Sequence, residues 1–348
     1  MDKDVGVVGS GSFGITISKL VSENNNVLLY ARNLETIKSI NDHHTHLGVK
    51  LSERIRATND LQEVCFACDL ILPALPSSAF REVMQKMSPY LHPYHIMIHA
   101  TKGLELNKID FDHLNLVRLD RRDIYTMSEV ILEETNVVRV GCLSGPNLAK
   151  EILANLPAAA VIASDFDEVI HYGQKALASK SFSVYASHDI KGAELAGAFK
   201  NIIAIASGML AGAGMGKNME ALLITRGLNE MISFGMKLGF SGQAFLGTAG
   251  IGDLIATATS DKSRNYTFGF RFARGESMDE IMSTSDEVVE GIRTLKILYH
   301  FCKNEKIHIP ITQMLYKVVY EEYPFKKGLE HLMSYPFTND VDFSVVSE

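Results

Sequence analysis

The stretch Val5-Gly6-Val7-Val8-Gly9-Ser10-Gly11-Ser12-Phe13-Gly14 decides the fold of the first part of the chain. Residues 5–8 have the apolar pattern of a short buried strand, and the glycines that follow have the spacing G-x-G-x-x-G. A helical pattern begins at about residue 12 and continues to about residue 23. Placed between a strand and a helix, this glycine run is the fingerprint of a dinucleotide site. The same glycines in another context would indicate no more than a turn.

Each glycine has an expected role in such a site. Gly9 permits the tight turn, Gly11 lets the backbone approach a pyrophosphate, and Gly14 lets the helix pack on the strand. The start of the helix then directs its free N–H groups at the phosphates. We therefore predict that this loop binds a dinucleotide, with a ligand-free glycine turn as the disfavoured alternative.

Outward from this loop, strand and helix patterns alternate. Apolar strands are predicted at residues 27–31, 69–75, 94–100 and 137–143, with helices at 34–40 and 77–87. The alternation predicts an α/β fold with a Rossmann-type, doubly wound parallel sheet. After strands at 158–163 and 182–185, helices dominate, at 192–209, 218–237, 278–282 and 291–304. We predict a Rossmann domain at 1–188 and an all-helical domain at 189–348, with the ligand in a cleft between them.

Composition narrows the class of protein. A chain of 348 residues corresponds to about two domains. The formal net charge of −7 provides no broad basic field, which argues against nucleic acid as the main partner. Four cysteines do not form a secreted disulfide scaffold, and we find neither a signal peptide nor an uninterrupted membrane span. We expect a cytoplasmic enzyme with a small-molecule substrate; its oligomeric state, a homodimer included, stays open.

The end of the second strand bears on the choice of cofactor. An NAD site favours a carboxylate there for the ribose 2′-hydroxyl. This chain has Leu29-Tyr30-Ala31-Arg32-Asn33, and the first acid is Glu35. Arg32 suits a 2′-phosphate by its charge and its planar fork, although it could also be a solvated surface arginine. We expect NADPH as the cofactor, with NADH as the alternative.

A lysine within an apolar helix is the first catalytic candidate. Glu194, Lys200 and Asn201 interrupt the small and apolar residues of 192–208. A buried ammonium is costly without a partner, and burial can lower its pKa. Such a lysine suits proton transfer to or from a carbonyl oxygen. From the helix alone, a lysine whose charge reaches the surface is an equal alternative.

Four further segments place polar groups at positions where ligands bind. The segments are Thr101-Lys102-Gly103, Ser144-Gly145-Pro146-Asn147, Gly250-Ile251-Gly252-Asp253 and Ser263-Arg264-Asn265. The first two follow parallel strands, where α/β proteins bind their ligands. The last offers a compact set of donors for phosphate or carboxylate. Each segment alone could be a turn or a helix cap, but together they supply two lysines, an arginine and an aspartate.

The order of these motifs makes a known family recognisable. They are Gly9 to Gly14, Ala100-Thr-Lys-Gly-Leu, Ser144-Gly-Pro, Gly192-Ala-Glu-Leu-Ala-Gly-Ala-Phe-Lys-Asn, Gly250-Ile-Gly-Asp-Leu, Ser263-Arg-Asn and Val289-Glu-Gly. From about residue 4 to about residue 325, the chain resembles the bacterial-type NAD(P)-dependent glycerol-3-phosphate dehydrogenases. The resemblance implies reversible reduction of dihydroxyacetone phosphate to sn-glycerol 3-phosphate, which supplies phospholipid synthesis.

The resemblance also assigns roles to residues. It makes Lys200 the proton donor and acceptor. The substrate positions it implies are Lys102, Gly145, Asn147, Lys200, Asp253, Ser263, Arg264 and Asn265. The cofactor positions it implies, besides the glycines, are Ser12, Phe13, Arg32, Lys102, Ala149, Arg264, Val288 and Glu290. In this scheme Lys102 polarises the ketone oxygen, Arg264 with Asn265 holds the phosphate, and Asp253 orients Lys200.

Two departures from the family pattern stand out. Asn147-Leu148 occupies positions where the family usually has Ser or Thr followed by an aromatic residue, although an amide can still donate to the substrate. The charged segment 104–136 is longer than expected. It could cover the cleft or contact another subunit, but a tolerated surface insertion is favoured.

Two other motifs are discounted. Cys65-Phe-Ala-Cys68 has redox spacing without a thioredoxin-like context, so we expect two semi-buried thiols. His43, His44 and His46 have no cysteine or patterned acid to complete a tetrahedral set, so we expect loop histidines and no metal.

Two competing functions stay open beside the dehydrogenase. One is a related Rossmann-plus-helical reductase of a carboxylate substrate. The other is a catalytically inactive NAD(P)H sensor, which should lack Lys200 or Lys102, and both are present.

Overall fold

The computed structural model describes residues 3–334, apart from 108, 241, 286 and 287. The chain forms two compact units, the first from Met1–Glu105 and Tyr125–Glu194, the second from Leu106–Ile124 and Leu195–Glu348. The sequence placed the boundary at 188/189 and the whole of 104–136 before it. The division between the two compact units falls between Glu194 and Leu195, inside one long helix, and Leu106–Ile124 groups with the helical unit.

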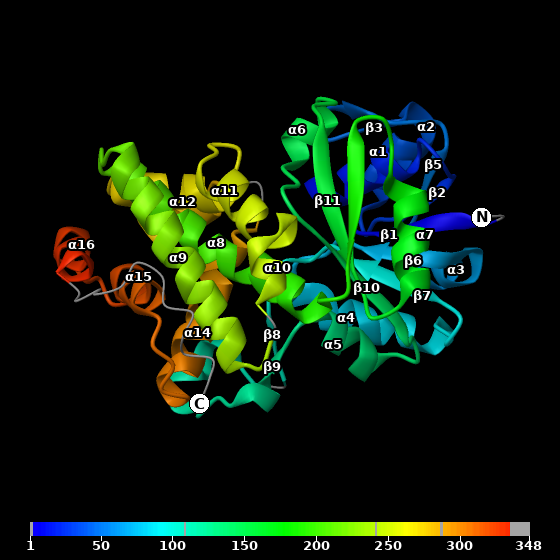
Figure 1. The fold of residues 1–348 in the computed structure, drawn as a ribbon. Helices are drawn as coiled ribbons and strands as arrows, with labels where there is room; N and C mark the ends of the chain where they lie inside the picture. Colours follow the sequence, from blue (N-terminus) through cyan, green and yellow to red (C-terminus); the bar gives the residue numbers. More distant parts are fainter. Residues whose placement is uncertain (1–2, 108, 241, 286–287, 335–348) are drawn as a thin grey trace. The chain divides into compact units, whose positions relative to one another are not determined.

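The first unit is built on an eight-stranded sheet in the order β12-β11-β10-β7-β6-β1-β2-β5 (Figure 1). Its strands are β1 (Asp4–Val8), β2 (Val27–Tyr30), β5 (Ile55–Thr58), β6 (Cys68–Pro73), β7 (Ile96–His99), β10 (Arg139–Ser144), β11 (Ala158–Ala163) and β12 (Phe182–Ser187). Neighbours from β5 to β10 pair in parallel, whereas β11 runs antiparallel to β10. The predicted doubly wound fold is confirmed, with this one antiparallel junction unpredicted.

Helices cover both faces of the sheet. They are α1 (Ser12–Val21), α2 (Leu34–His43), α3 (Leu61–Ala67), α4 (Ser77–Met87), α5 (Met127–Glu134), α6 (Ala149–Leu153) and α7 (Asp167–Leu177). Residues Val5 and Val7 of β1 belong to one core cluster, with α1, α2, α6 and α7, while Val8 belongs to the other, with α3, α4 and α5. Because side chains alternate along a strand, burial on both faces explains the continuous apolar runs of the sequence.

A short hairpin follows α2 and was not predicted. It consists of β3 (Thr45–His46) and β4 (Val49–Lys50). Its two turn residues, Leu47 and Gly48, have φ of 49° and 73°. Positive φ at both central residues is the pattern of a type I′ turn, which suits the twist of a two-residue hairpin.

The second unit is helical. Helix α8 (Ile190–Gly212) begins in the first unit and enters the second, followed by α9 (Lys217–Lys237), α10 (Gln243–Leu246), a π-helical turn (Thr248–Gly252), α11 (Asp253–Ala258), α12 (Arg264–Ala273), α13 (Met278–Ser283), α14 (Glu290–Asn304), α15 (Pro310–Tyr320) and α16 (Phe325–Met333). Helices α8 and α12 pack with their backbones in close approach. A Cβ on Gly208 would lie 1.9 Å from the Tyr266 carbonyl oxygen, and one on Gly269 equally close to that of Ile205.

The segment Leu106–Ile124 packs on the second unit. It contains two 3₁₀ turns, Phe111–Leu116 and Arg121–Asp123, and short strands β8 (Glu105–Leu106) and β9 (Ile124–Tyr125) lie at its ends. The cations of Arg293 and Lys296 on α14 lie 4.8 and 4.6 Å from the centroid of the Phe111 ring. These cation–π contacts tie the segment to α14, so it is part of the helical unit and more than a loose surface insertion.

Helix α8 bears on the expectation that the chain has no membrane span. Among the described residues, it alone is long and apolar enough to cross a membrane. However, 89% of its most apolar window is buried inside the structure, and the core helix of a globular protein satisfies the same criteria. The helix is therefore weak support for a membrane span.

Candidate functional site

The glycine loop of the first unit has the close contacts that its sequence predicts. Gly9 has φ of +118°, and a Cβ there would lie 2.5 Å from the Ala74 carbonyl oxygen. A Cβ on Gly14 would lie 1.8 Å from the carbonyl oxygen of Gly9. By contrast, a Cβ on Gly11 would meet no atom within 4 Å. Packing within the protein explains Gly9 and Gly14, whereas the space beside Gly11 fits the approach of a ligand.

Helix α1 begins directly at this loop. Gly11 is its N-cap and has no side chain to satisfy the N–H groups of the first turn, at Ser12 and Phe13. No acidic residue occupies that turn. The unsatisfied N–H groups and the positive end of the helix dipole favour an anion. The loop and helix therefore fit the pyrophosphate of a dinucleotide.

Arg32 lies just beyond the end of β2 and is exposed. It lies within electrostatic reach of Glu82 on α4. The Lys86 ammonium is the main cause of the lowered pKa of Glu82, and the charge of Arg32 lowers it further. This acidic neighbour was not predicted, because it comes from a helix distant in sequence. An exposed guanidinium at this strand end remains available to a ribose substituent.

Predicted substrate residues of the first unit gather at the ends of β7 and β10. The Lys102 ammonium donates to the Gly145 carbonyl oxygen at 2.9 Å. Asn147 is buried and its amide donates to the Ser144 carbonyl oxygen at 3.3 Å, while its Oδ1 has no hydrogen-bond partner among the described residues. Ala149 is the first residue of α6. A hydrogen bond thus brings Lys102 and Gly145 together at the strand ends, and Asn147 follows two residues later in the chain.

Lys200 lies in the second unit and is buried, so the surface alternative is wrong. Its ammonium forms an ion pair with Asp253, the first residue of α11, and donates to Thr257 Oγ1 at 2.7 Å. The side chains of Lys200 and Asp253 are only 6% and 1% exposed. A buried ammonium with a carboxylate and a hydroxyl as neighbours can hold a proton at a defined position. Thr257, one helical turn after Asp253, was not predicted.

Asn201, the residue that follows Lys200, belongs to a second network of hydrogen bonds. Asn265 on α12 donates to Asn201 Oδ1 at 2.9 Å and accepts from the Gly291 N–H at 3.0 Å. The amide of Asn265 is buried and links α8, α12 and the start of α14. The sequence analysis predicted that Asn265 contacts the phosphate. Its hydrogen bonds with Asn201 and Gly291 show that it also fixes the position of Asn201, next to Lys200. The Val289-Glu-Gly motif lies at the same junction.

The start of α12 presents the other predicted anion groups. Ser263 is its N-cap and accepts from the Tyr266 N–H at 3.3 Å, which leaves the hydroxyl proton able to donate. Arg264 is the first helical residue and is exposed. Glu290 is buried at the first position of α14, and Val288 just before that helix is exposed. A helix start with an arginine and a serine suits a phosphate.

A buried network in the first unit was only partly anticipated. Glu194, noted in the sequence as a polar interruption, accepts from the backbone N–H and hydroxyl of Ser128 at 2.8 and 2.6 Å. His99 Nε2 lies 2.8 Å from Glu194 Oε1, the oxygen that also accepts from the Ser128 backbone N–H. Burial would raise the pKa of Glu194, but His99 and Ser128 outweigh it and lower the pKa. Glu194 thus fixes the first turns of α8 to the end of β7 and the start of α5.

Neither discounted motif shows redox or metal-binding geometry in the part of the chain that is described. Cys65 and Cys68 are buried, and burial raises the pKa of each thiol to about 12, which opposes thiolate chemistry. No cluster of His, Cys, Asp or Glu within residues 3–334, with the four gaps given above, could hold a metal ion.

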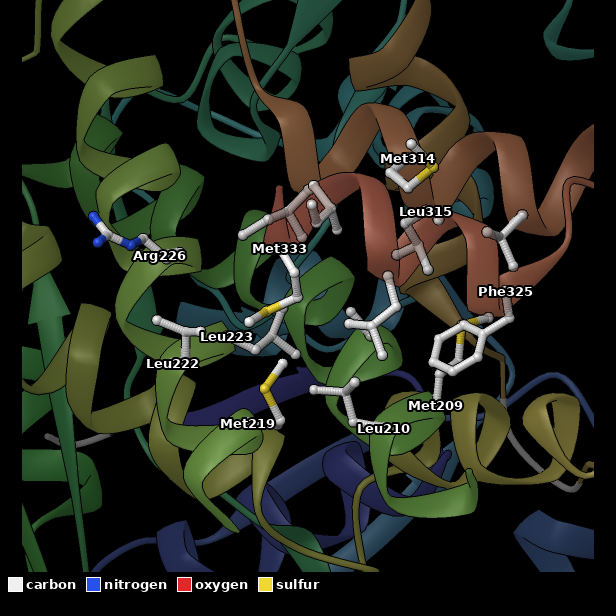
Figure 2. Close-up of a pocket in the computed structure, with 16 residues that line it drawn as sticks. Met209, Leu210, Met219, Leu222, Leu223, Arg226, Met314, Leu315, Phe325 and Met333 are labelled. Atoms are coloured by element: carbon white, nitrogen blue, oxygen red, sulfur yellow. The ribbon is translucent and has the colours of Figure 1, made fainter. Parts of the chain in front are cut away.

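A cavity of about 270 Å³ lies elsewhere in the second unit, among α8, α9, α15 and α16 (Figure 2). Its lining is largely apolar and includes Met209, Leu210, Met219, Leu223, Met314 and Phe325. It contains none of the predicted site residues. A cavity with so few polar groups does not suit a phosphorylated substrate.

Comparison with known proteins agrees with this geometry. Residues 4–170 match the family described as NAD-dependent glycerol-3-phosphate dehydrogenase N-terminus, and residues 189–330 match the corresponding C-terminus. A glycerol-3-phosphate dehydrogenase [NAD(P)+] of Staphylococcus haemolyticus is 39% identical over 94% of this chain and 96% of its own length. One from Ectopseudomonas mendocina is 40% identical, over 97% and 96%. The crystal structure of the Coxiella burnetii glycerol-3-phosphate dehydrogenase superposes with a TM-score of 0.86 at 28% identity, over 95% of this chain and 99% of that one. This chain therefore belongs to the NAD(P)-dependent glycerol-3-phosphate dehydrogenase family.

Proposed function

We propose that this protein interconverts dihydroxyacetone phosphate and sn-glycerol 3-phosphate, with Lys200 as the proton donor and acceptor. The observation that supports it most is the buried ion pair of Lys200 with Asp253. A lysine paired in this way is costly to maintain without a function. The family to which the chain belongs supplies the reaction class.

The chemistry divides between hydride and proton. A bound nicotinamide supplies the hydride that reaches the carbonyl carbon. As negative charge develops on the carbonyl oxygen, Lys200 donates a proton to it, and in the reverse direction it takes that proton back. Asp253 and Thr257 hold the ammonium, so its proton is presented from a fixed position. Lys102 is proposed to stabilise the same developing charge electrostatically.

The phosphate is proposed to bind at the start of α12. Arg264 can form charge-assisted hydrogen bonds with it, and the Ser263 hydroxyl and the helix N–H groups add donors. Asn265 contributes chiefly by holding Asn201 and α14, as its hydrogen bonds indicate. Fixing the phosphate positions the ketone for attack.

The cofactor proposal assigns Gly9, Gly11 and Gly14 and the start of α1 to the pyrophosphate, and Arg32 to a 2′-phosphate. Ala149, Val288 and Glu290 are proposed as further cofactor contacts. Since Arg32 replaces an acid, NADPH is preferred over NADH. In the cell, we propose a cytoplasmic enzyme, a homodimer in solution, that supplies glycerol 3-phosphate for phospholipid synthesis.

The test is oxidation of reduced cofactor by the purified protein with dihydroxyacetone phosphate, followed at 340 nm with NADPH and NADH in parallel. Formation of one glycerol 3-phosphate per cofactor oxidised supports the proposal. Oxidation that proceeds equally well with a non-phosphorylated 2-oxo acid would instead support a carboxylate-directed reductase. Binding of cofactor without any turnover would support an inactive sensor.

A further inference from the structure

Of the three clustered histidines, one makes a contact with the dinucleotide loop. His43 is exposed in the last turn of α2, and His44 caps that helix with φ of 49°. His46 lies in β3, and its Nε2 is 3.1 Å from the carbonyl oxygen of Ser10. Ser10 is the residue between Gly9 and Gly11. His46, which lies in a separate hairpin, therefore forms a hydrogen bond with the glycine loop at Ser10.

The position of His46 is set by its hairpin. The Ser39 hydroxyl on α2 donates to the Thr45 carbonyl oxygen at 2.7 Å. The Leu51 N–H donates to the His44 carbonyl oxygen, also at 2.7 Å, and the Leu51 side chain is buried in the core. With its two-residue turn, the hairpin is tied at both ends. His46 can therefore restrain the loop instead of following it.

The contact completes the fixing of three consecutive residues. The Gly9 N–H donates to the Tyr30 carbonyl oxygen at 3.1 Å, and the Gly11 carbonyl oxygen accepts from Ile15 at 3.0 Å. His46 holds the carbonyl of Ser10 between them. The Ser10–Gly11 peptide is trans, so its C=O and N–H point in opposite directions. Holding the carbonyl therefore directs the Gly11 N–H to the side away from His46.

We propose that His46 is a positioning residue for the cofactor, which orients the Ser10–Gly11 peptide before the pyrophosphate binds. Gly11 is both the N-cap of α1 and the glycine with open space beside it, so this peptide borders the proposed pyrophosphate position. A loop already held in its bound conformation loses less entropy on binding. The inference rests on the cofactor site of the proposed function and adds to it a residue outside the glycine motif.

The test compares four variants by calorimetric titration with NADPH, NADH and ADP. His46→Leu removes the donor, His46→Gln retains an N–H at similar reach, and His46→Asn has the same amide on a shorter stem. His43→Leu is the matched control on the exposed neighbour. We expect a roughly fivefold rise in Kd for His46→Leu and His46→Asn with all three ligands, as for loss of one neutral hydrogen bond. We expect near wild-type Kd for His46→Gln and His43→Leu.

The kinetic readout separates positioning from a general loss of structure. With saturating cofactor, kcat and the KM for dihydroxyacetone phosphate should not change in any variant, while the KM for the cofactor should rise with Kd. Equal Kd for wild type and His46→Leu would overturn the inference, as would a His46→Gln protein as weak as His46→Asn. If His46→Leu fails to fold, the Gln and Asn pair decides. A wild-type protein that binds none of the nucleotides would instead contradict the proposed cofactor site.

Discussion

Replacing Lys200 by methionine separates the catalytic from the structural role of the buried ion pair. Methionine keeps much of the apolar stem and removes the charge. Asp253 would then be a 1% exposed carboxylate without its cation, although the Thr257 hydroxyl can still donate to it, at 3.4 Å. Removing one partner of a buried pair costs about 3–5 kcal/mol. We expect a loss of this size in the free energy of unfolding, measured with urea.

The same variant should lose turnover for a different reason. Loss of a general acid lowers kcat by roughly 10²–10⁴-fold. The double variant Lys200→Met/Asp253→Asn removes both charges of the buried pair, so most of the stability should return while turnover stays low. Recovery of stability without recovery of activity distinguishes catalysis from folding. A folded Lys200→Met protein with near-normal turnover would refute the role of Lys200 and leave Lys102 as the proton donor.

Three further changes test separate parts of the account. Arg32→Asp should weaken binding of NADPH more than of NADH; equal losses in Kd would show that Arg32 does not contact the 2′-phosphate. Arg264→Lys keeps the charge and loses the planar fork, so kcat/KM for dihydroxyacetone phosphate should fall by about 1–3 kcal/mol in transition-state binding, and an unchanged value would place the phosphate elsewhere. Burial raises the pKa of Glu230 from 4.5 to about 7, although Ile311 and Thr312 donate hydrogen bonds to it. Because this pKa is higher in the folded state, the protonated carboxyl of Glu230 contributes its full stabilisation below about pH 4.5. That contribution, on the order of 3 kcal/mol, is lost as the pH rises through about 7. Urea unfolding of Glu230→Gln should lack this pH dependence; an identical pH profile for the variant and wild type would contradict the assignment.

The sequence predicted those elements whose local pattern is strong. The first strand, the glycine loop and α1 follow from one stretch, and helices such as Ser77–Met87 have the predicted bounds. Strand β5 and the β3–β4 hairpin were missed, because four-residue and two-residue strands have too short a pattern to detect. The placement of Leu106–Ile124 was missed for another reason: it depends on the packing of Phe111 against α14, a contact distant in sequence.

The candidate site shows the same limit. Motif positions indicated Lys200, Asp253 and Arg264 one at a time, and the structure pairs the first two as expected. Thr257 and the bond between Asn201 and Asn265 could not be predicted, since they depend on how α8, α11 and α12 pack. Hydrogen-bond partners of this kind are set by tertiary structure, and no spacing within one helix identifies them.

The most direct test of the account compares dihydroxyacetone phosphate with dihydroxyacetone in the same NADPH oxidation assay. The two ketones differ only in the phosphate that Ser263 and Arg264 are proposed to hold. At about 1.5–3 kcal/mol for each hydrogen bond to a charged group, two such bonds predict a kcat/KM at least roughly 10²-fold higher for the phosphorylated ketone. Comparable kcat/KM values for the two ketones would contradict a phosphate-selective dehydrogenase.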